Sequence, residues 1–347
     1  MSITLGGYEM ELLQQGKGEL IGWYDPDEAR DWVLKNKSRE LKDKTMSVTE
    51  AVSKFVHDGD FIASGGFGHT RVSMAVIYEI IRQNRRNLIM AGKTAVHDLD
   101  VLVASGHVNK VEVAYSFGHE LRGLSPGSRR MVQTGQCKVV AETSNAGYQW
   151  RWLAAMMGLP FIPTRTMLGT DTLAYSSCKV VEDPFSGKPV ALVPAAYPDV
   201  AFIHVHRCDI YGNAQIDGIL VEDFELSRCA RRLIITTEKI VDNEFIRREP
   251  WRTSIPFMVV DAVVEVRYGS HPCEMPGMYY YDEDHIAEWL SLSRTSEGVE
   301  EYMQKYVFGV GSFDDYLELC GGVKKLDYLK RREFLEEPMT APWRKES

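Results

Sequence analysis

The sequence predicts an α/β protein with an open, mostly parallel β-sheet, helices on both faces of that sheet, and additional helices at its C-terminal end. Three observations predict this fold. Apolar runs that suit strands alternate with helical segments over residues 46–266. The first run, residues 61–63, has no charge, as expected of a strand buried on both faces. From residue 282 onward the apolar residues follow helical spacing, with short links between segments.

The individual elements follow from the same patterns. A capping box formed by Ser47 and Glu50 opens the first helix of the main domain. We expect strands at residues 61–63, 87–91, 111–116, 138–142, 190–193, 200–205, 232–237 and 259–266. We expect helices at residues 28–41, 47–56, 72–82, 99–105, 147–157, 220–229, 283–292, 297–307 and 314–319.

The chain divides into three parts by composition. Residues 1–45 are polar and form an N-terminal extension, whose aromatic residues indicate that it lies on the body or on a partner. Residues 46–330 form the main domain. Residues 331–347 are charged and contain two prolines, so we expect a loosely ordered tail.

Composition excludes several classes of function. The chain has 347 residues, 44% of them hydrophobic, and a net charge of -9, which disfavours nucleic-acid binding. The sequence has neither a signal peptide nor an apolar run long enough for a membrane span, so we expect a soluble cytoplasmic protein. The six cysteines form no CxxC pair and are expected to be reduced thiols in or near the core.

A glycine turn follows the first strand and is the first candidate site. Ser64, Gly65, Gly66, Phe67 and Gly68 come directly before a helix. Glycine lets another group approach the backbone, and a helix start offers unpaired N–H donors for an anion or a carbonyl oxygen. The alternative is a tight turn that only packs. The pattern is not a dinucleotide or P-loop fingerprint, which argues against a Rossmann dehydrogenase.

A second candidate lies after the strand at residues 111–116. His119, Glu120 and Arg122 follow this strand, and in a parallel sheet they reach the same rim as the glycine turn. Glu120 would be a general base or a substrate-orienting group there. The alternative is a salt bridge at the rim.

Other histidines do not indicate a metal centre. His204, His206 and Cys208 alternate along a strand, but a zinc site also needs a fourth ligand and supporting groups that the sequence does not show. We interpret these three residues as polar groups satisfied within the fold. His97 and His107 flank a helix and are interpreted as structural. We therefore assign no metal ligand.

Several motifs resemble the α subunits of family I CoA-transferases, most closely those of the glutaconate CoA-transferase type. The resemblance is in register over residues 46–322. The first motif departs from the family pattern, which has a glycine and a proline after Gly-Gly-Phe, whereas Arg71, Val72 and Ser73 stand here. The segments that carry the resemblance are residues 58–67, 154–163, 199–204, 237–241, 244–250, 260–264 and 268–272.

The resemblance implies a fold of the family I CoA-transferase type and half of an enzyme. In this family a glutamate attacks an acyl-CoA to form an anhydride and then a glutamyl-CoA thioester, which a second carboxylic acid attacks. That glutamate usually belongs to the β subunit, and its sequence context is missing here, so we expect no catalytic residue in this chain. The resemblance also implies a β-subunit partner, a heterotetramer or heterooctamer, coenzyme A as substrate, and no cofactor.

The resemblance further implies two walls of an acyl pocket. The glycine turn, Gly65, Gly66, Phe67 and Gly68, would form one wall, and Ser116, His119 and Glu120 would form the second. Arg71 is a candidate for binding a substrate carboxylate through two parallel hydrogen bonds. It is equally interpretable as an exposed residue at a helix start.

Two other functions stay open. Proteins similar to these α subunits include ring-opening hydrolases of cyclic CoA thioesters and a decarboxylase, in which a carboxylate such as Glu120 would activate water or a C–H bond. A non-catalytic scaffold or regulator is the third possibility, because this chain has no unambiguous nucleophile. The sequence of the partner distinguishes transfer from hydrolysis or decarboxylation.

Overall fold

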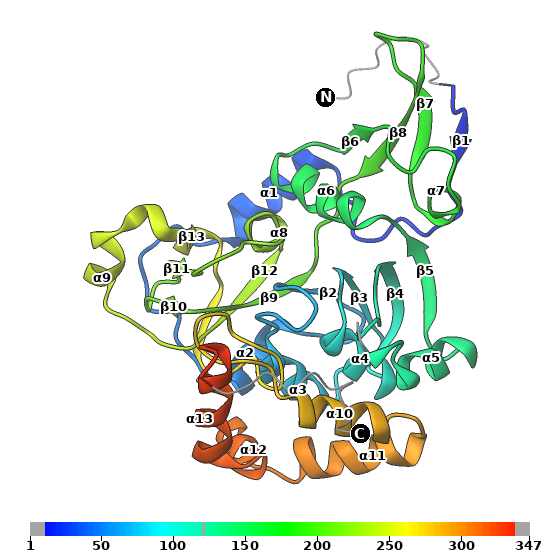
Figure 1. The fold of residues 1–347 in the computed structure, drawn as a ribbon. Coiled ribbons are helices and arrows are strands. Elements are labelled where there is room, and N and C mark those ends of the chain that lie inside the picture. The colour runs from blue at the N-terminus through cyan, green and yellow to red at the C-terminus, as the bar shows by residue number, and fades with distance from the viewer. Residues whose placement is uncertain (1–10, 120–121, 337–347) are drawn as a thin grey trace.

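A seven-stranded parallel sheet forms the centre of the computed structural model, which describes residues 11–119 and 122–336 (Figure 1). Its strand order is β14-β12-β9-β2-β3-β4-β5, and every neighbouring pair is parallel. This confirms the predicted fold class. The strands are β2 (Phe61–Ser64), β3 (Leu88–Lys93), β4 (Val108–Ala114), β5 (Lys138–Glu142), β9 (Val200–Val205), β12 (Arg232–Thr237) and β14 (Ala262–Glu265).

Alternate side chains of each strand enter two separate cores. Ile62 packs in the core beneath the sheet with helices α2 (Val48–Phe55), α3 (Met74–Arg82) and α4 (His97–Ala104). Its neighbour Ala63 packs in the core on the opposite face. Helices α6 (Asn145–Met156) and α8 (Asp223–Cys229) cover that second face, and α5 (Pro126–Gln133) lies with α4. Helices on both faces explain why every residue of β2 and β9 is buried.

The sheet has a switch point between β2 and β9. From β2 the chain continues through β3, β4 and β5 on one side, whereas from β9 it continues through β12 and β14 on the other. In open α/β sheets a crevice forms at the carboxyl ends of the strands where the order reverses. The glycine turn follows β2 and therefore lies at this crevice.

Part of the chain forms a second, antiparallel sheet that we did not predict. The segment 190–193, which we assigned to the parallel sheet, belongs instead to β8 (Pro189–Pro194) of the order β1-β7-β8-β6. Its side chains alternate in burial, so this sheet covers a core on one side only. The other members are β1 (Gln14–Gln15), β6 (Phe161–Thr164) and β7 (Lys179–Glu182). A small three-stranded sheet consists of β10 (Arg207–Cys208), β11 (Ala214–Gln215) and β13 (Thr253–Ile255).

Short helices connect these peripheral elements. They are α7 (Asp171–Tyr175), α9 (Asn243–Arg248), and two 3-10 helices at Pro250–Arg252 and Phe257–Val259.

The described part of the N-terminal extension lies on the body of the same chain. Strand β1 pairs with β7, and helix α1 (Pro26–Asn36) follows it. Lys37 Nζ lies 2.5 Å from Asp261 Oδ2, and Lys44 Nζ donates to the backbone oxygen of Phe257 at 2.6 Å. Residues 11–45 are therefore packed against the main domain, while residues 1–10 are outside the described residues.

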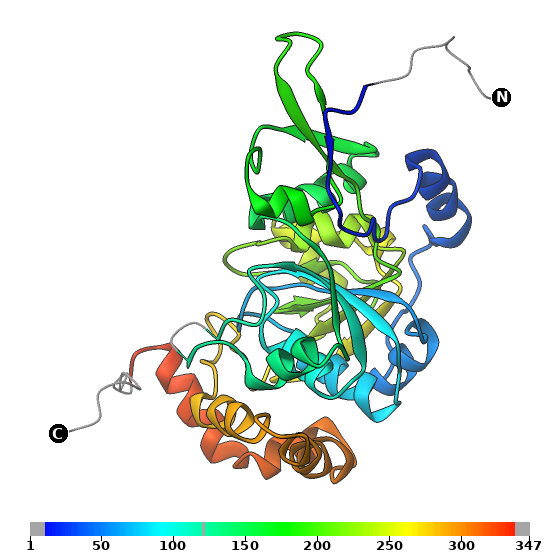
Figure 2. The same cartoon turned by 90° about the vertical axis from the view of Figure 1, so that its right-hand side faces the viewer.

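Helices at the C-terminal end cover the lower face (Figure 2). The three predicted helices are confirmed as α10 (Glu283–Leu292), α11 (Ser296–Met303) with a π-helical continuation (Gln304–Phe308), and α12 (Phe313–Leu319). A fourth, α13 (Gly322–Glu333), was not predicted, because it is mostly charged and buries only Gly322 and Leu329. Residues 331–333, which we assigned to the tail, are thus helical, and residues 337–347 lie outside the described residues.

The cysteines are free thiols in or near the core, as the sequence indicated. All six cysteines are free, and five of them are buried. None of the helices in the described residues combines the length and apolar character needed to cross a bilayer.

One buried arginine joins the separate parts of the fold. Arg151 of α6 forms an ion pair with Glu112 of β4, and both side chains are 1% exposed. Its Nε donates to the backbone oxygen of Pro194 in β8 at 3.1 Å, and its Nη2 donates to the backbone oxygen of Ile21 in the extension at 2.6 Å. Burial raises the pKa of Glu112, so its charge depends on this arginine.

We expect Arg151→Met to lower the free energy of unfolding by about 3–5 kcal/mol, because it leaves the Glu112 carboxylate buried without its partner. Replacing both residues, as Glu112→Leu with Arg151→Met, should recover at least half of that loss. Urea unfolding followed by circular dichroism measures both effects. Arg247→Met is the control, since Arg247 pairs with Glu244 at the surface and should cost under about 1 kcal/mol. Equal losses at both arginines would contradict this role of Arg151.

Candidate active site at the glycine turn

The glycine turn lines a small pocket at the carboxyl ends of β2 and β3. Residues 64–68 form one side, and residues 92–95 form another. Asp98 of α4 and Glu222, the residue just before α8, complete the lining with Val72. The volume of this pocket is about 10 Å³, about the space of one water molecule. The predicted residues Gly65, Gly66, Phe67 and Gly68 are therefore brought together around one pocket.

A buried carboxylate, Asp223, fixes the conformation of this turn. Its Oδ1 accepts a hydrogen bond from the Gly66 N–H at 3.0 Å, and its Oδ2 accepts one from Arg71 Nη2 at 2.7 Å. A Cβ at position 65 would lie 2.6 Å from Asp223 Oδ1. Gly66 has φ of +87°, in the region that favours glycine. Both glycines are thus required for the turn to fit against Asp223.

The turn does not offer the free N–H donors that we expected. Gly65, Phe67 and Gly68 donate their N–H groups to backbone oxygens of Phe202, Thr70 and Thr94, respectively, and Gly66 donates to Asp223. The first N–H groups of α3 are also engaged, and that of Ala75, for example, donates to the backbone oxygen of Gly269. The expectation of unpaired donors at this helix start is therefore wrong. Contacts within the fold satisfy these donors instead.

Backbone strain is concentrated at this rim. Arg71 after β2, Thr94 after β3, and Tyr115 and Phe117 after β4 all have φ between 53° and 66°. Residues other than glycine rarely adopt this region, and such conformations persist where the surrounding structure enforces them. Three consecutive strands thus end in strained loops at the same rim of the sheet.

Two buried carboxyl groups and one lysine are the ionisable groups that line the pocket. Burial raises the pKa of Asp98 to about 6, and burial raises the pKa of Glu222 well above its ordinary range. Trp152 Nε1 donates to Glu222 Oε2 at 3.1 Å. Lys93 donates to Gln149 Oε1 at 2.9 Å and lies 6.0 Å from the centre of the Phe67 ring. Asp98 can therefore gain or lose a proton near neutral pH, and burial favours the protonated form of Glu222.

Arg71 lies behind the glycine turn. Its side chain is 1% exposed, so the interpretation of Arg71 as an exposed helix-start residue is wrong. Its Nη2 is held by Asp223 and by the backbone oxygen of Ile219 at 2.9 Å, while its Nη1 is buried and has no hydrogen-bond partner among the described residues. Arg71 Nη2 is thus fully used in holding the fold together. Nη1 has N–H donors that no residue in 11–119 or 122–336 accepts.

Ser116 and His119, two of the three residues proposed for the second wall, are not among the described residues that line the pocket. His119 is fully buried and lies beside His69 and Asp100. Ser116 has a buried hydroxyl without a hydrogen-bond partner in the described part of the chain. Glu120 lies outside the described residues. Arg122, which we placed at this rim, donates from Nε to Glu283 Oε1 at 2.7 Å.

The histidines in and just after β9 have partners within the fold. His204 contacts Thr236 Oγ1 and Glu238 Oε1, both at 2.8 Å. His206 Nε2 contacts the backbone oxygen of Pro276 at 2.8 Å, and Cys208 is fully buried. This agrees with our interpretation of these residues as satisfied polar groups.

Sequence reasoning missed Lys93, Asp98, Glu222 and Asp223. Lys93 had a usable signal, because it comes just after an expected strand and would reach the same rim. Asp98, Glu222 and Asp223 had no such signal in the sequence, because they lie in or beside helical segments, where acidic residues are usually solvated. Only the packing of α4 and α8 against the sheet reveals them.

Comparisons with known proteins agree with this architecture. The model of the family "Coenzyme A transferase" matches residues 45–266. The A subunit of glutaconate CoA-transferase from Acidaminococcus fermentans is 31% identical over 301 residues, which are 82% of this chain and 94% of that protein. The crystal structure of the Acidaminococcus fermentans glutaconate coenzyme A-transferase matches with a TM-score of 0.79 and 32% identity, covering 83% of this chain and 95% of that one.

Two further relatives are named for other activities. The crystal structure of a cysteine-to-serine variant of the decarboxylase AibA/AibB matches with a TM-score of 0.65 and 30% identity, covering 75% of this chain and 99% of that one. The cholesterol ring-cleaving hydrolase IpdA subunit of Rhodococcus jostii is 26% identical over 285 residues, which are 79% of this chain and 95% of that protein.

The family model covers most of the main domain, and the A subunit of the glutaconate enzyme is related along nearly its whole length. The chain therefore belongs to the coenzyme A transferase family, as an α subunit of the family I type.

Proposed function

We propose that this chain is the α subunit of a heteromeric CoA-transferase that moves coenzyme A between an acyl-CoA and a carboxylic acid. The reactive glutamate would come from a β subunit, and coenzyme A would be a substrate rather than a resident cofactor. The glutamate attacks the acyl-CoA and releases CoA thiolate; the thiolate attacks the resulting anhydride, giving a glutamyl-CoA thioester and the free acid. A second acid then reverses these steps.

The pocket at the glycine turn carries this proposal. Its volume of about 10 Å³ is far below the range of about 300–1,000 Å³ that is usual for ligand sites. The glycine turn forms one side of it, at the switch point of the sheet where ligands of such folds bind. A second subunit placed over this rim would deepen it into a cavity large enough for an acyl group.

The charged groups of the pocket suit a supporting role. A nucleophilic carboxylate must be ionised, whereas burial raises the pKa of Glu222 well above its ordinary range. The protonated form of Glu222, which burial favours, and the side chain of Lys93 would be hydrogen-bond donors on this wall, as a developing oxyanion requires. Arg71 would offer Nη1 to a carboxylate that reaches behind the turn.

The alternative is a subunit of a CoA-thioester hydrolase or decarboxylase of the same fold. This alternative is supported by the similarity of the chain to the decarboxylase AibA/AibB and to the IpdA hydrolase subunit. Under this alternative Glu120 would activate water or a C–H bond, and the partner would lack the transferase glutamate.

Transfer should require both subunits. We expect the purified chain alone to have negligible transferase activity, and the complex with its β subunit to lose activity when incubated with an acyl-CoA and then hydroxylamine, which traps a glutamyl thioester. Peptide mapping by mass spectrometry should place the modified glutamate in the β subunit. Full turnover by this chain alone, or a modified carboxylate in it, would refute the proposal.

Asp223→Ala should lower kcat/KM of the complex by about 100-fold, because the glycine turn loses its anchor and small displacements at a reacting centre are costly. The variant should still bind the β subunit in gel filtration, which separates this effect from loss of assembly. Glu244→Gln is the matched control, since its carboxylate is 72% exposed in α9, and it should keep activity within about twofold. Unchanged kcat/KM in a folded Asp223→Ala complex would exclude the turn from the active site.

Glu120→Gln distinguishes the two functions. Transfer should fall only modestly, by less than about tenfold, because the nucleophile belongs to the partner. Under the alternative, the same change removes the general base and should lower the rate by about 100-fold or more. Steady-state assays with acyl-CoA, in the presence and absence of an acceptor acid, separate the two outcomes.

A further inference from the structure

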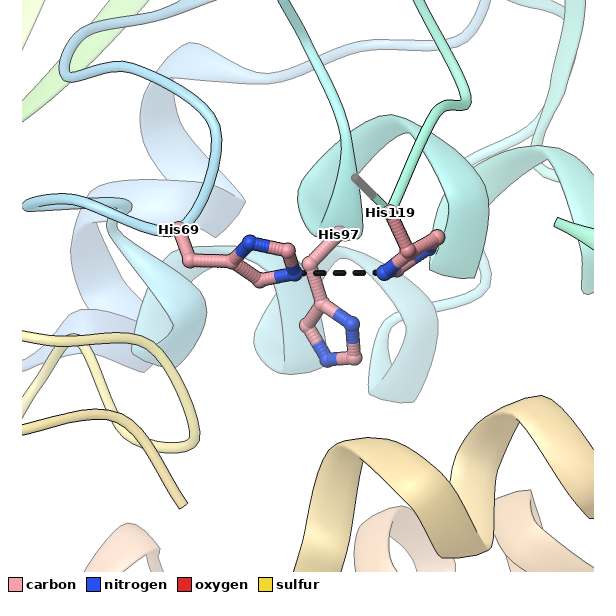
Figure 3. Close-up of side chains that lie close together, drawn as sticks. All are labelled: His69, His97 and His119. Atoms are coloured by element: carbon pink, nitrogen blue, oxygen red, sulfur yellow. Dashed lines mark hydrogen bonds between the residues drawn. The ribbon is translucent and has the colours of Figure 1, made fainter. Parts of the chain in front are cut away.

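Three histidines from three successive loops meet beside the glycine turn (Figure 3). His69 belongs to the loop after β2, His97 is the first residue of α4 after β3, and His119 lies in the loop after β4. The three are 8%, 0% and 0% exposed, respectively. One ring nitrogen of each lies within 4.8 Å of those of the other two. The sequence analysis assigned no metal ligand, and we interpreted His97 as structural.

The spacing of these nitrogens is close to that of a metal centre. Zinc–nitrogen bonds of about 2.1 Å in a tetrahedral site place two ligand nitrogens about 3.4 Å apart. His69 Nε2 and His119 Nδ1 are 3.1 Å apart, and Figure 3 shows the ring of His97 beside this contact. A shift of about 1–1.5 Å in the His97 ring would bring all three nitrogens to bonding distance.

His97 is the observation that points to a ligand. Both of its ring nitrogens are buried, and neither has a hydrogen-bond partner within the described ranges 11–119 and 122–336. A buried polar group left unpaired costs about 1–3 kcal/mol, so such groups usually have a function or an unseen partner.

A second layer of contacts orients His119 as a ligand. Its Nε2 lies 3.3 Å from Asp100 Oδ2, which leaves the Nδ1 lone pair directed at the cluster. Trp289 Nε1 and Ser128 Oγ each donate to Asp100 at 2.6 Å, and Ser125 Oγ also donates to it. Burial opposes ionisation of Asp100, but the hydrogen bonds from His119 and the two serines outweigh it and lower its pKa. A fixed carboxylate behind a histidine is the usual support of a metal ligand.

We propose that His69, His97 and His119 bind a divalent transition metal, with zinc as the ion that their chemistry fits best. Imidazole ligands suit zinc, and three histidines with one water complete a tetrahedral site. Without metal, His69 Nε2–H donates to His119 Nδ1; on binding, the His69 proton moves to its own Nδ1, so no proton is released. The charge of the ion is offset by Asp100, behind His119.

Such an ion would join three loops that carry the rim of the sheet. His69 directly follows Gly68 of the glycine turn, and His119 follows the strained residues Tyr115 and Phe117. One ion would therefore hold the glycine turn, the start of α4 and the loop after β4 in a fixed arrangement. This role is independent of the reaction that the complex performs.

The test is zinc binding by the full-length chain, produced without a histidine tag and stripped with a chelator. Titration with zinc sulfate against a chromophoric chelator should give one equivalent per chain, and cobalt(II) should give the visible absorption bands of a four-coordinate ion. His69→Ala and His97→Gln should each weaken binding by at least about 100-fold. Zinc should also raise the melting temperature of the natural chain but not that of His69→Ala.

His107→Ala is the matched control. His107 is 3% exposed and also has a ring nitrogen without a partner in the described residues, but it lies at the opposite end of α4 from the cluster. Zinc affinity should stay within about twofold in this variant. Failure of the natural chain to take up one equivalent of zinc or cobalt(II) would overturn the proposal. So would uptake that both folded cluster variants leave unchanged, because the ion would then be adventitious.

Discussion

The carboxylate of Asp223 is the contact on which the glycine turn depends. It accepts from the Gly66 N–H and from Arg71, and it lies so close to Gly65 that a side chain there would collide with it. Asp223 is the first residue of α8, which packs on the sheet face opposite α3. The shape of the turn is therefore set by a helix far away in the sequence. Any change in the packing of α8 is transmitted to the pocket.

The parallel sheet explains why functional groups gather at one rim. The chain leaves β2, β3 and β4 at the same edge, and each exit loop contains a residue with positive φ or a buried histidine. Small side chains such as Ala63, Ala91 and Ala201 line the sheet face beneath α6 and α8. They let these helices approach closely, which brings Glu222 and Asp223 within reach of the turn. The geometry of the pocket follows from sheet packing rather than from the loops alone.

The sequence predicted the elements whose signal is local. Strands β2, β9 and β12 are apolar runs buried on both faces, and these were recognised. The antiparallel sheet was missed because β6 and β7 are short and half-exposed, so their pattern resembles that of a loop. Helix α13 was missed because few of its residues are buried.

The same distinction applies to the site. The glycine turn was predicted from residue types that require a particular backbone, and that signal is local. The carboxyl groups of Asp98 and Glu222 were not predicted as part of the site. The sequence does not show whether another element will cover an acidic residue in a helical segment. The histidine cluster combines three loops, and their meeting depends on strand order, which a single sequence does not specify.

The contacts of Arg151 determine where the chain can be truncated. The family-model match begins at residue 45, yet Arg151 donates to the backbone of Ile21, and β1 supplies an outer strand beside β7. A truncation at residue 45 would remove the backbone oxygen of Ile21, which accepts a hydrogen bond from the buried Arg151 guanidinium. It would also remove β1 and expose the edge of strand β7. The segment that matches the family model is thus shorter than the segment that packs together in the fold. Chimaeras with other α subunits should exchange the leading residues together with the body.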